Sequence, residues 1–207
     1  MEACIVACGI FQPELELVLE QIKAEQALED GIEIAYVAPA LHVDYDRLKE
    51  GITAALDAVT ADRTVLLFGS MCHPEIGEFT EHYGVVRPTP GNCVELILGK
   101  ERMQEIEKSA RVFYLTPGWL QNWDQIFRQG QGWDDIDARQ NFGFYDKILL
   151  LDTGVGSIED DAILSFFEYT QVPIEIEKVE LTNFQKNVTA MLKTALAELP
   201  AAGAAGG

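Results

Sequence analysis

The stretch Thr64–Phe68 (TVLLF), followed by the turn Gly69-Ser70-Met71-Cys72-His73-Pro74, decides the fold. Its five residues are uncharged and mostly aliphatic, which is typical of a strand buried on both faces of a parallel sheet. The glycine and the proline that follow predict a turn directly after this strand. Comparable apolar runs, each ending at a turn, lie at Ala3–Ala7, Ile32–Ala38, Val112–Leu115 and Ile148–Leu151.

The segments between these runs have the pattern of amphipathic helices. Residues 15–22, for example, place leucine, valine and isoleucine at helical spacing, with charged residues on the opposite side. We expect two further strands, at Val85-Val86 and at Ile174–Leu181, and a last helix capped by Asn183. The alternation of strand and helix predicts an α/β fold of the Rossmann-like kind, a doubly wound, mostly parallel sheet with helices on both faces.

Length and composition favour one globular domain. The chain has 207 residues, of which 48% are hydrophobic and 24% charged, so it can bury a sizeable core. We expect a single α/β domain over residues 2–200 and a disordered, low-complexity tail at residues 201–207. An aromatic-rich insertion at about residues 119–145 is expected either to cover the ligand cleft as a lid or to form a small core of its own.

Charge and cysteine content limit the classes of partner. The chain has 34 acidic and 15 basic residues and a formal net charge of −19, which disfavours nucleic acids and anionic membranes. No apolar run approaches the ~18 residues of a membrane span, and the start does not resemble a signal peptide. We therefore expect a cytoplasmic protein, in which cysteines are metal ligands, catalytic thiols or core residues before they are disulfides. The sequence leaves the oligomeric state open.

Thiol and imidazole side chains gather where the predicted strands end. Cys8 follows the first strand, His42 the second and Cys72-His73 the third, while Cys93 lies at the start of the helix after the fourth. Ligands bind outside the carboxyl ends of the strands in open α/β sheets, so we expect these side chains to line one site. Cys4 lies inside the first strand instead, and we expect it to pack in the core.

Cys8, Cys72 and Cys93 are the predicted metal ligands. The sequence contains no C-x-x-C pair, so distant segments must assemble the site. Three thiolates suit an iron–sulfur cluster, zinc or copper(I). A [4Fe–4S] cluster bound by three cysteines keeps one iron open, whereas zinc completes its tetrahedron with His42 or His73.

His42 and His73 are also the candidate catalytic acids or bases. The turn Asp152–Ser157 (DTGVGS) exposes backbone amides as a phosphate-binding turn does, although helix capping explains it equally. No G-x-S-x-G elbow supports a serine hydrolase. Four further residues at the predicted strand ends are candidates for holding a cofactor: Gly9, Asn92, Trp119 and Asp152.

Five short motifs spread over roughly residues 3–182 carry a family resemblance. They are Val6-Ala7-Cys8-Gly9, Leu41-His42, Phe68-Gly69-Ser70-Met71-Cys72, Gly91-Asn92-Cys93-Val94-Glu95-Leu96 and Phe113-Tyr114-Leu115-Thr116-Pro117-Gly118-Trp119. Together they resemble the family filed as domain of unknown function 1638. The chain departs from the family pattern at Val43, His73 and Asn92, where Asn, Gly and His or Asp are usual, but it keeps the three thiols. The resemblance implies an association with anaerobic, corrinoid-dependent methyl-transfer metabolism.

Three classes of function remain open, and with them the question whether the protein is an enzyme. The first is a metal-binding protein with a [4Fe–4S] cluster, or a Cys₃His zinc site, that serves redox or substrate activation. The second is a metal-free thiol enzyme with Cys72 or Cys93 as nucleophile and His42 or His73 as base. The third is a module that binds a corrinoid or a corrinoid protein through the aromatic insertion. The expected partners are accordingly a small-molecule substrate or a corrinoid protein.

Overall fold

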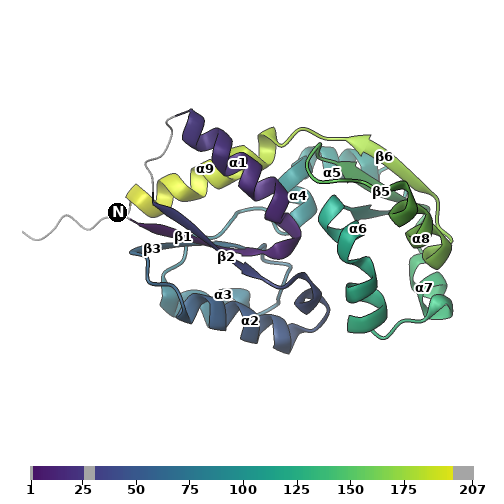
Figure 1. Ribbon diagram of the computed structural model, residues 1–207, viewed down its shortest axis with the longest axis horizontal. Helices are drawn as coiled ribbons and strands as arrows, with labels where there is room; N and C mark the ends of the chain where they lie inside the picture. The colour runs from purple at the N-terminus through teal and green to yellow at the C-terminus, as the bar shows by residue number, and fades with distance from the viewer. Residues whose placement is uncertain (1, 26–30, 198–207) are drawn as a thin grey trace, which may run out of the picture.

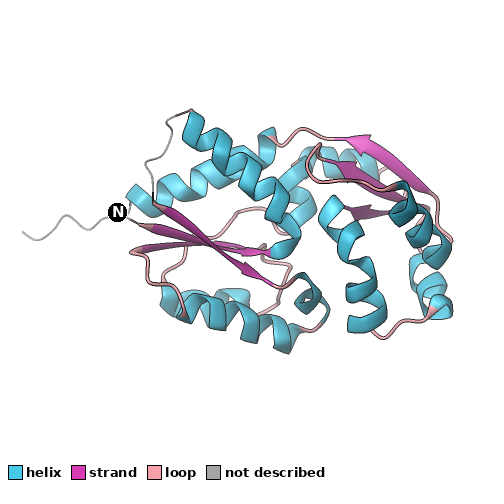
Figure 2. Cartoon of the chain, viewed as in Figure 1, coloured by secondary structure: helices cyan, strands magenta, loops and turns pink. Residues whose placement is uncertain are grey.

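The computed structural model describes residues 2–25 and 31–197 and shows an α/β fold built on two parallel three-stranded sheets (Figures 1 and 2). The first sheet has the strand order β2-β1-β3 and the second the order β4-β5-β6. Every strand pair in both sheets is parallel, which confirms the predicted fold class. The strands span Ala3–Cys8 (β1), Ile32–Val37 (β2), Arg63–Leu67 (β3), Val112–Leu115 (β4), Lys147–Asp152 (β5) and Ile174–Lys178 (β6).

The first sheet is covered by helices on both faces, with α1 and α9 on one side and α2 and α3 on the other (Figure 1). The last helix, α9, returns from the second sheet to pack on β1, β3, α1 and α4. The helices of this half are Gln12–Ala24 (α1), Tyr45–Asp57 (α2), Ile76–Thr80 (α3), Cys93–Leu98 (α4) and Thr182–Ala197 (α9), with short 3₁₀ turns at Gly9–Phe11 (η1), Pro39–Val43 (η2) and Glu81–Tyr83 (η3).

The second sheet is flanked by Lys100–Glu107 (α5), Pro117–Trp123 (α6), the π-helix Asp124–Gly130 (η4), Asp135–Phe142 (α7) and Asp160–Thr170 (α8). Gly99 separates α4 from α5 with a φ of 79°, a conformation that glycine adopts without strain. Gly99 therefore ends α4 and allows α5 to begin directly after it.

The position of strand β1 between two core clusters explains why its sequence is almost entirely apolar. Ile5 and Ala7 point into the core beneath α1 and α9, while Cys4 and Val6 point into a second core cluster beneath α2. All four are nearly inaccessible to solvent, because successive side chains of a strand face opposite sides of the sheet. The core placement expected for Cys4 is confirmed.

The largest core cluster includes residues of both sheets. Val65 and Leu67 of β3 belong to it together with Leu149 and Leu151 of β5. The apolar interior therefore continues from one sheet into the other.

Two expected strand boundaries differ from the structure. Val86 forms only a single parallel bridge with Val65, although its N–H donates to Thr64 O and its carbonyl accepts from Leu66 N. Pro88 follows two residues later and has no N–H with which to continue the pairing. Strand β6 ends at Lys178 instead of Leu181.

Residues 119–145 form the helical cover of the second sheet. The ring of Phe127 lies 5.8 Å from Trp133, 5.1 Å from Phe142 and 6.1 Å from Phe166, measured between ring centroids. Phe127 and Phe142 are nearly inaccessible to solvent. These contacts support the interpretation of the segment as a packed core of its own.

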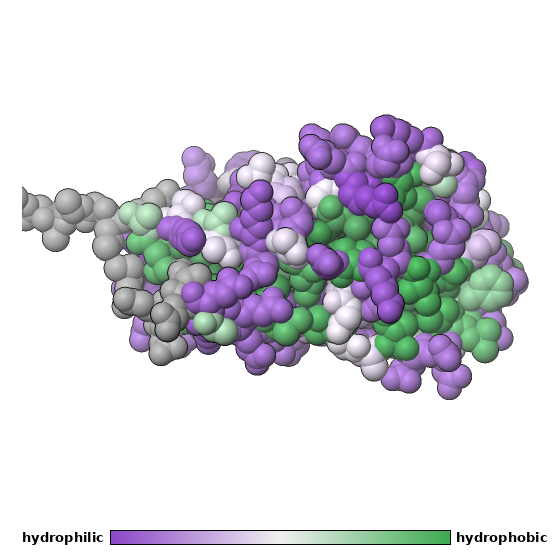
Figure 3. Space-filling view, turned by 90° about the horizontal axis from the view of Figure 1, so that it is seen from above, coloured by the Kyte–Doolittle hydropathy of each residue, from purple (hydrophilic) through white to green (hydrophobic). Residues whose placement is uncertain are grey.

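The surface is mostly hydrophilic, and its exposed hydrophobic residues gather over the second half. On the face seen in Figure 3, green is most extensive on the right, where the second sheet and its helices lie. The large exposed hydrophobic side chains of this half are Ile136, Phe144, Leu164, Phe167 and Ile176. None of the helices in the described ranges is long and apolar enough to cross a membrane. The tail expected to be disordered, residues 201–207, lies outside the described residues.

Candidate functional site

Cys8, Cys72 and Cys93 line one small cavity at the carboxyl end of the first sheet. Cys8 is the last residue of β1, Cys72 follows β3, and Cys93 is the first residue of α4. The cavity has a volume of about 20 Å³, close to the space of one water molecule. The other residues of its wall are Ile10, Phe11, His42, Leu67, Phe68, Gly69, Leu96 and Trp119. The convergence of the three predicted ligands on one site is thus present in the fold.

A tight contact between two loops places Cys72 beside Cys93. The N–H of Met71 donates to the carbonyl oxygen of Gly91 over 2.8 Å. A Cβ on Gly69 would lie 2.8 Å from the nitrogen of Asn92 and closer still to the carbonyl of Gly91. Because real Cβ atoms do not approach other atoms so closely, only glycine lets these loops meet.

Asn92 fixes the start of α4 and with it the position of Cys93. Its Oδ1 accepts from the N–H of Glu95 over 2.9 Å, as an N-cap residue does. The carboxylate of Glu95 in turn accepts from the N–H of Gly91 over 2.8 Å. The side-chain amide nitrogen of Asn92 lies 3.7 Å from the sulfur of Met71. The cofactor-binding candidate Asn92 therefore acts as a helix cap next to the cavity.

Trp119 reaches the cavity from α6 and covers the same side as His42. The two rings meet edge to face with centroids 5.2 Å apart. Gly118 brings this helix close enough, since a Cβ there would collide with the carbonyl oxygen of Ile10. Trp119 also stacks on Phe127 at 5.9 Å, so one indole connects the cysteine cavity with the aromatic core of the second half.

The protein surroundings keep the three thiols in the neutral form. The three cysteine residues are half-buried, and burial raises the pKa of Cys8 to about 12 and that of Cys72 to about 12. Burial also raises the pKa of Cys93, while a hydrogen bond with the Trp119 side chain acts in the opposite direction. The proximity of the three sulfurs adds to the shift, because a thiolate at Cys93 raises the pKa of both other cysteines.

His42 is the one ionisable nitrogen group of the cavity wall. Burial lowers its pKa, so the imidazole is neutral at pH 7 and can accept a proton or a metal. No lysine or arginine lines the cavity. The site therefore lacks the positive charge that lowers the pKa of nucleophilic cysteines.

Within residues 2–25 and 31–197, no group of three or more His, Cys, Asp or Glu side chains is arranged to hold a metal ion.

Comparison with known proteins places the chain in a family. The family model described as "Protein of unknown function (DUF1638)" matches residues 36–188. The chain is a member of the DUF1638 family. The matched range includes His42, Cys72, Cys93 and Trp119, whereas Cys8 lies before it.

No curated protein matches this DUF1638 chain significantly. Among solved structures, the crystal structure of an ABC domain in complex with L-Trp from Streptococcus pneumonia has a TM-score of 0.47 and 8% sequence identity. The match covers 96% of this chain and 86% of that chain. A likeness of this size supports no argument about ligand or activity.

Three other predicted residues lie outside the cavity of this DUF1638 member. His73 is 3% exposed, its Nδ1 accepts from the N–H of Glu75 over 3.0 Å, and its ring packs between Tyr45 and Phe79. The structure therefore places His73 in a packing role, outside the cavity that the three thiols line.

Asp152 and Gly9 are the remaining candidates. The Oδ1 of Asp152 accepts from the N–H of Gly154 over 3.0 Å, so its carboxylate shapes the turn after β5. Gly9 follows Cys8 directly and lines a neighbouring cavity.

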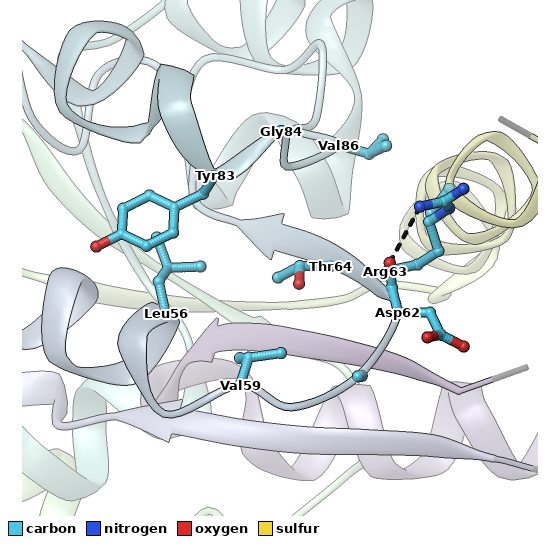
Figure 4. A pocket seen from close by; sticks show the side chains of 10 residues that line it. Leu56, Val59, Asp62, Arg63, Thr64, Tyr83, Gly84 and Val86 are labelled. Carbon is cyan, nitrogen blue, oxygen red and sulfur yellow. Dashed lines mark hydrogen bonds between the residues drawn. The ribbon is translucent and has the colours of Figure 1, made fainter. Parts of the chain in front are cut away.

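A second hollow near β3 lies away from this chemistry. It is lined by Asp62, Arg63 and Thr64, before and at the start of β3, and by Tyr83 (Figure 4). The guanidinium of Arg63 donates to the carbonyl oxygen of Asp62 over 3.1 Å. This hollow is at the amino end of the strand, opposite to the cysteine cavity, and contains no cysteine or histidine.

Proposed function

We propose that this protein binds a metal centre through Cys8, Cys72 and Cys93, and that the centre is a [4Fe–4S] cluster with one iron not bound by cysteine. The observation that carries the proposal is the convergence of three thiols from three separate segments on one cavity. Apart from these thiols, His42 and Gly69, its wall consists of apolar and aromatic side chains. Buried thiols brought together in this way suit a soft metal centre.

The arrangement favours a cluster over a single ion. Tetrahedral zinc with Zn–S bonds of about 2.3 Å holds its sulfurs about 3.7 Å apart. No group in the described ranges of the chain has the arrangement of such a site. A cluster spaces its cysteine ligands more widely, and the cavity of about 20 Å³ must widen by rotation of the cysteine side chains to admit it. Zinc, the alternative occupant, is distinguished by the experiment below.

The chain's own residues would shape the chemistry at the open position. A cluster with a free iron supplies a Lewis-acid or one-electron site. His42, neutral and next to Trp119, would accept a proton from a molecule bound there. The apolar wall of Ile10, Phe11 and Leu96 excludes water, which strengthens each polar contact inside.

The surroundings of the thiols disfavour a metal-free thiol enzyme. A cysteine nucleophile needs a lowered pKa, supplied by a cation or a protonated histidine. Burial acts in the opposite direction on Cys72 and Cys93, and His42 is neutral. A metal cation would stabilise the thiolates that the protein alone does not.

Metal and sulfide analysis of protein purified without oxygen tests the proposal. We expect about four iron and four sulfide per chain, a broad charge-transfer absorption, and their loss in Cys72→Ser and Cys93→Ser. Cys4→Ala serves as the matched control, since Cys4 lies in the core on the same strand as Cys8 and should keep full metal content. If the analysis found stoichiometric zinc and no iron, the three cysteines would hold zinc and not a cluster. Full metal content in the triple variant of Cys8, Cys72 and Cys93 would contradict the proposal altogether.

The wider context stays a prediction. The family resemblance implies the link to corrinoid-dependent methyl transfer and a corrinoid or corrinoid-protein partner, and the sequence pattern predicts a cytoplasmic location. The same metal analysis bears on the corrinoid alternative, because a bound corrinoid would bring cobalt and its own visible spectrum.

A further inference from the structure

A second cavity, of about 540 Å³, lies behind the wall of the cysteine cavity. Its lining comes from the ends of β1 and β2, from the first turns of α1, and from α6. Gly9 and Gly118 line this second cavity, whereas their neighbours Cys8 and Trp119 line the first. The volume is in the range of small-molecule sites, which occur preferentially where two structural units meet.

The polar side chains of this cavity present acceptors. The side-chain amide nitrogen of Gln12 donates to Glu16 Oε1 over 3.0 Å, and that of Asn122 donates to the carbonyl of Gly118 over 2.8 Å. The amide nitrogen of Gln121 donates to the carbonyl of Ser157 over 3.4 Å. No hydrogen bond within the described ranges uses the amide oxygens of these three residues, so each keeps a free acceptor.

The charges of the lining point to a cationic ligand. Glu16 contributes a carboxylate, and no lysine, arginine or histidine is among the lining residues. The hydroxyl of Tyr36 is buried next to the Glu16 carboxylate. Burial, together with the nearby Glu16 carboxylate, raises the pKa of Tyr36 to about 12, so this hydroxyl is neutral at pH 7. No cationic side chain among the lining residues would pair with an anion, whereas an ammonium group would find the Glu16 carboxylate and the amide oxygens.

We propose that this cavity binds a small aliphatic primary ammonium compound, with one of its three N–H groups on Glu16 and the others on acceptors drawn from Tyr36 and the amide oxygens of Gln12, Gln121 and Asn122. The side chains of Pro13, Val37 and Pro39 offer an apolar wall for the carbon chain. This inference is independent of the metal centre, because none of the three cysteines lines the second cavity.

Titration with three probes of equal size tests the proposal: propylammonium chloride, 1-propanol and sodium propionate. Side-chain amide signals in nitrogen-15 NMR spectra of the full chain report binding. We expect propylammonium to shift the signals of Gln12, Gln121 and Asn122 to saturation, propanol to bind at least about tenfold more weakly, and propionate to leave them unchanged. Such ratios are the size expected for one charge-assisted hydrogen bond.

Two variants separate a specific site from general attraction to an acidic protein. Glu16→Gln should weaken propylammonium binding about tenfold or more. The matched control Glu20→Gln removes an exposed carboxylate of the same helix that does not line the cavity and should leave binding unchanged. Equal weakening by both variants, binding of propionate, or shifts spread over the acidic surface would overturn the proposal. Each of these results is independent of metal content, so they do not bear on the cysteine site.

Discussion

The two halves of the molecule share one layout and use it differently. In each, three parallel strands end at loops on the carboxyl side of the sheet. In the first half Cys8 ends β1 and Cys72 follows β3, whereas in the second half Thr116 follows β4 and Thr153 follows β5. All four cysteines of the chain lie at or before residue 93. The second half instead holds the aromatic cluster around Phe127. The two sheets thus present the same kind of edge but carry different residues there. In the first half thiols line a cavity, whereas in the second half aromatic rings pack together.

The strongest test of the second half as a packing unit is Phe127→Ala. Phe127 contacts the rings of Trp119, Trp133, Phe142 and Phe166, so we expect a loss of about 3–5 kcal/mol in the free energy of unfolding, measured by urea denaturation. Metal content of the folded fraction should be retained.

The matched control for Phe127→Ala is Phe144→Ala. Phe144 is 64% exposed, so Phe144→Ala should lower the free energy of unfolding by about 1 kcal/mol at most, since surface substitutions are usually mild. Equal costs for the two phenylalanines would remove the distinction between a packed and a superficial ring.

Gly118→Ala tests the contact that joins the two halves. A Cβ at this position collides with the carbonyl of Ile10, so we expect a loss of about 1–3 kcal/mol by the cost of overpacking. The change should also move Trp119, seen as a shift of its fluorescence. Gly77→Ala is the control, because a Cβ there meets only the flexible end of Arg87 at 3.4 Å. If Gly118→Ala were as mild as Gly77→Ala, the close approach of α6 to the cavity would not hold.

Cys4→Ala separates a core thiol from a cavity thiol on one strand. Cys4 packs among apolar residues beneath α2, so its loss should cost about 1 kcal/mol in unfolding free energy. Metal content should stay unchanged, while Cys8→Ala should lose the metal. Metal loss in Cys4→Ala together with retention in Cys8→Ala would reverse the two assignments.

The smallest effect is expected from a buried carboxylate between the halves. Glu14 of α1 is inaccessible to solvent, and its Oε1 accepts from the hydroxyl of Thr153 over 3.0 Å, while its Oε2 has no partner among the described residues. Burial raises the pKa of Glu14 above its ordinary value of 4.5. The folded state therefore binds this proton more tightly than the unfolded state, and the stability it contributes is complete below pH 4.5 and is lost as the pH rises above it.

Glu14→Gln should flatten this pH dependence and increase stability at pH 8 relative to the parent. Urea denaturation at pH 4, 6 and 8 measures it, with the exposed Glu20→Gln as control. The assigned direction would be contradicted if the stability of the parent protein rose from pH 4.5 to pH 8 and Glu14→Gln abolished this rise.

The strands were predictable because each is an apolar run that ends at residues unsuited to strands. Thr64–Phe68 and Ile148–Leu151 correspond closely to β3 and β5. The division into two sheets was not visible in the sequence, since it depends on which strands pair over long distances and not on their local pattern. Val85-Val86 has the residue types of a strand, but the prolines that follow confine its pairing to one bridge.

The candidate site was predictable in its thiols and less so in their surroundings. Position at a strand end was sufficient to predict Cys8 and Cys72 in one site, whereas Cys93 reaches it from the start of α4, after a predicted strand that forms only one bridge. His73 carries the same positional signal, yet its Nδ1 is engaged by the backbone of Glu75, a contact that no spacing rule gives. The polar cavity around Glu16 was missed, because its residues come from two helices and a strand end that only the folded chain unites.

The return of α9 to the first sheet determines when the cysteine cavity can form during synthesis. Phe184 of α9 packs against Phe11 with ring centroids 5.2 Å apart, and Phe11 is a wall of that cavity. At about 5–20 residues per second, roughly 5–18 s separate the synthesis of Cys93 from that of Phe184. During this interval the three thiols exist without their finished enclosure. We therefore expect the proposed metal centre to bind only after α9 has been made.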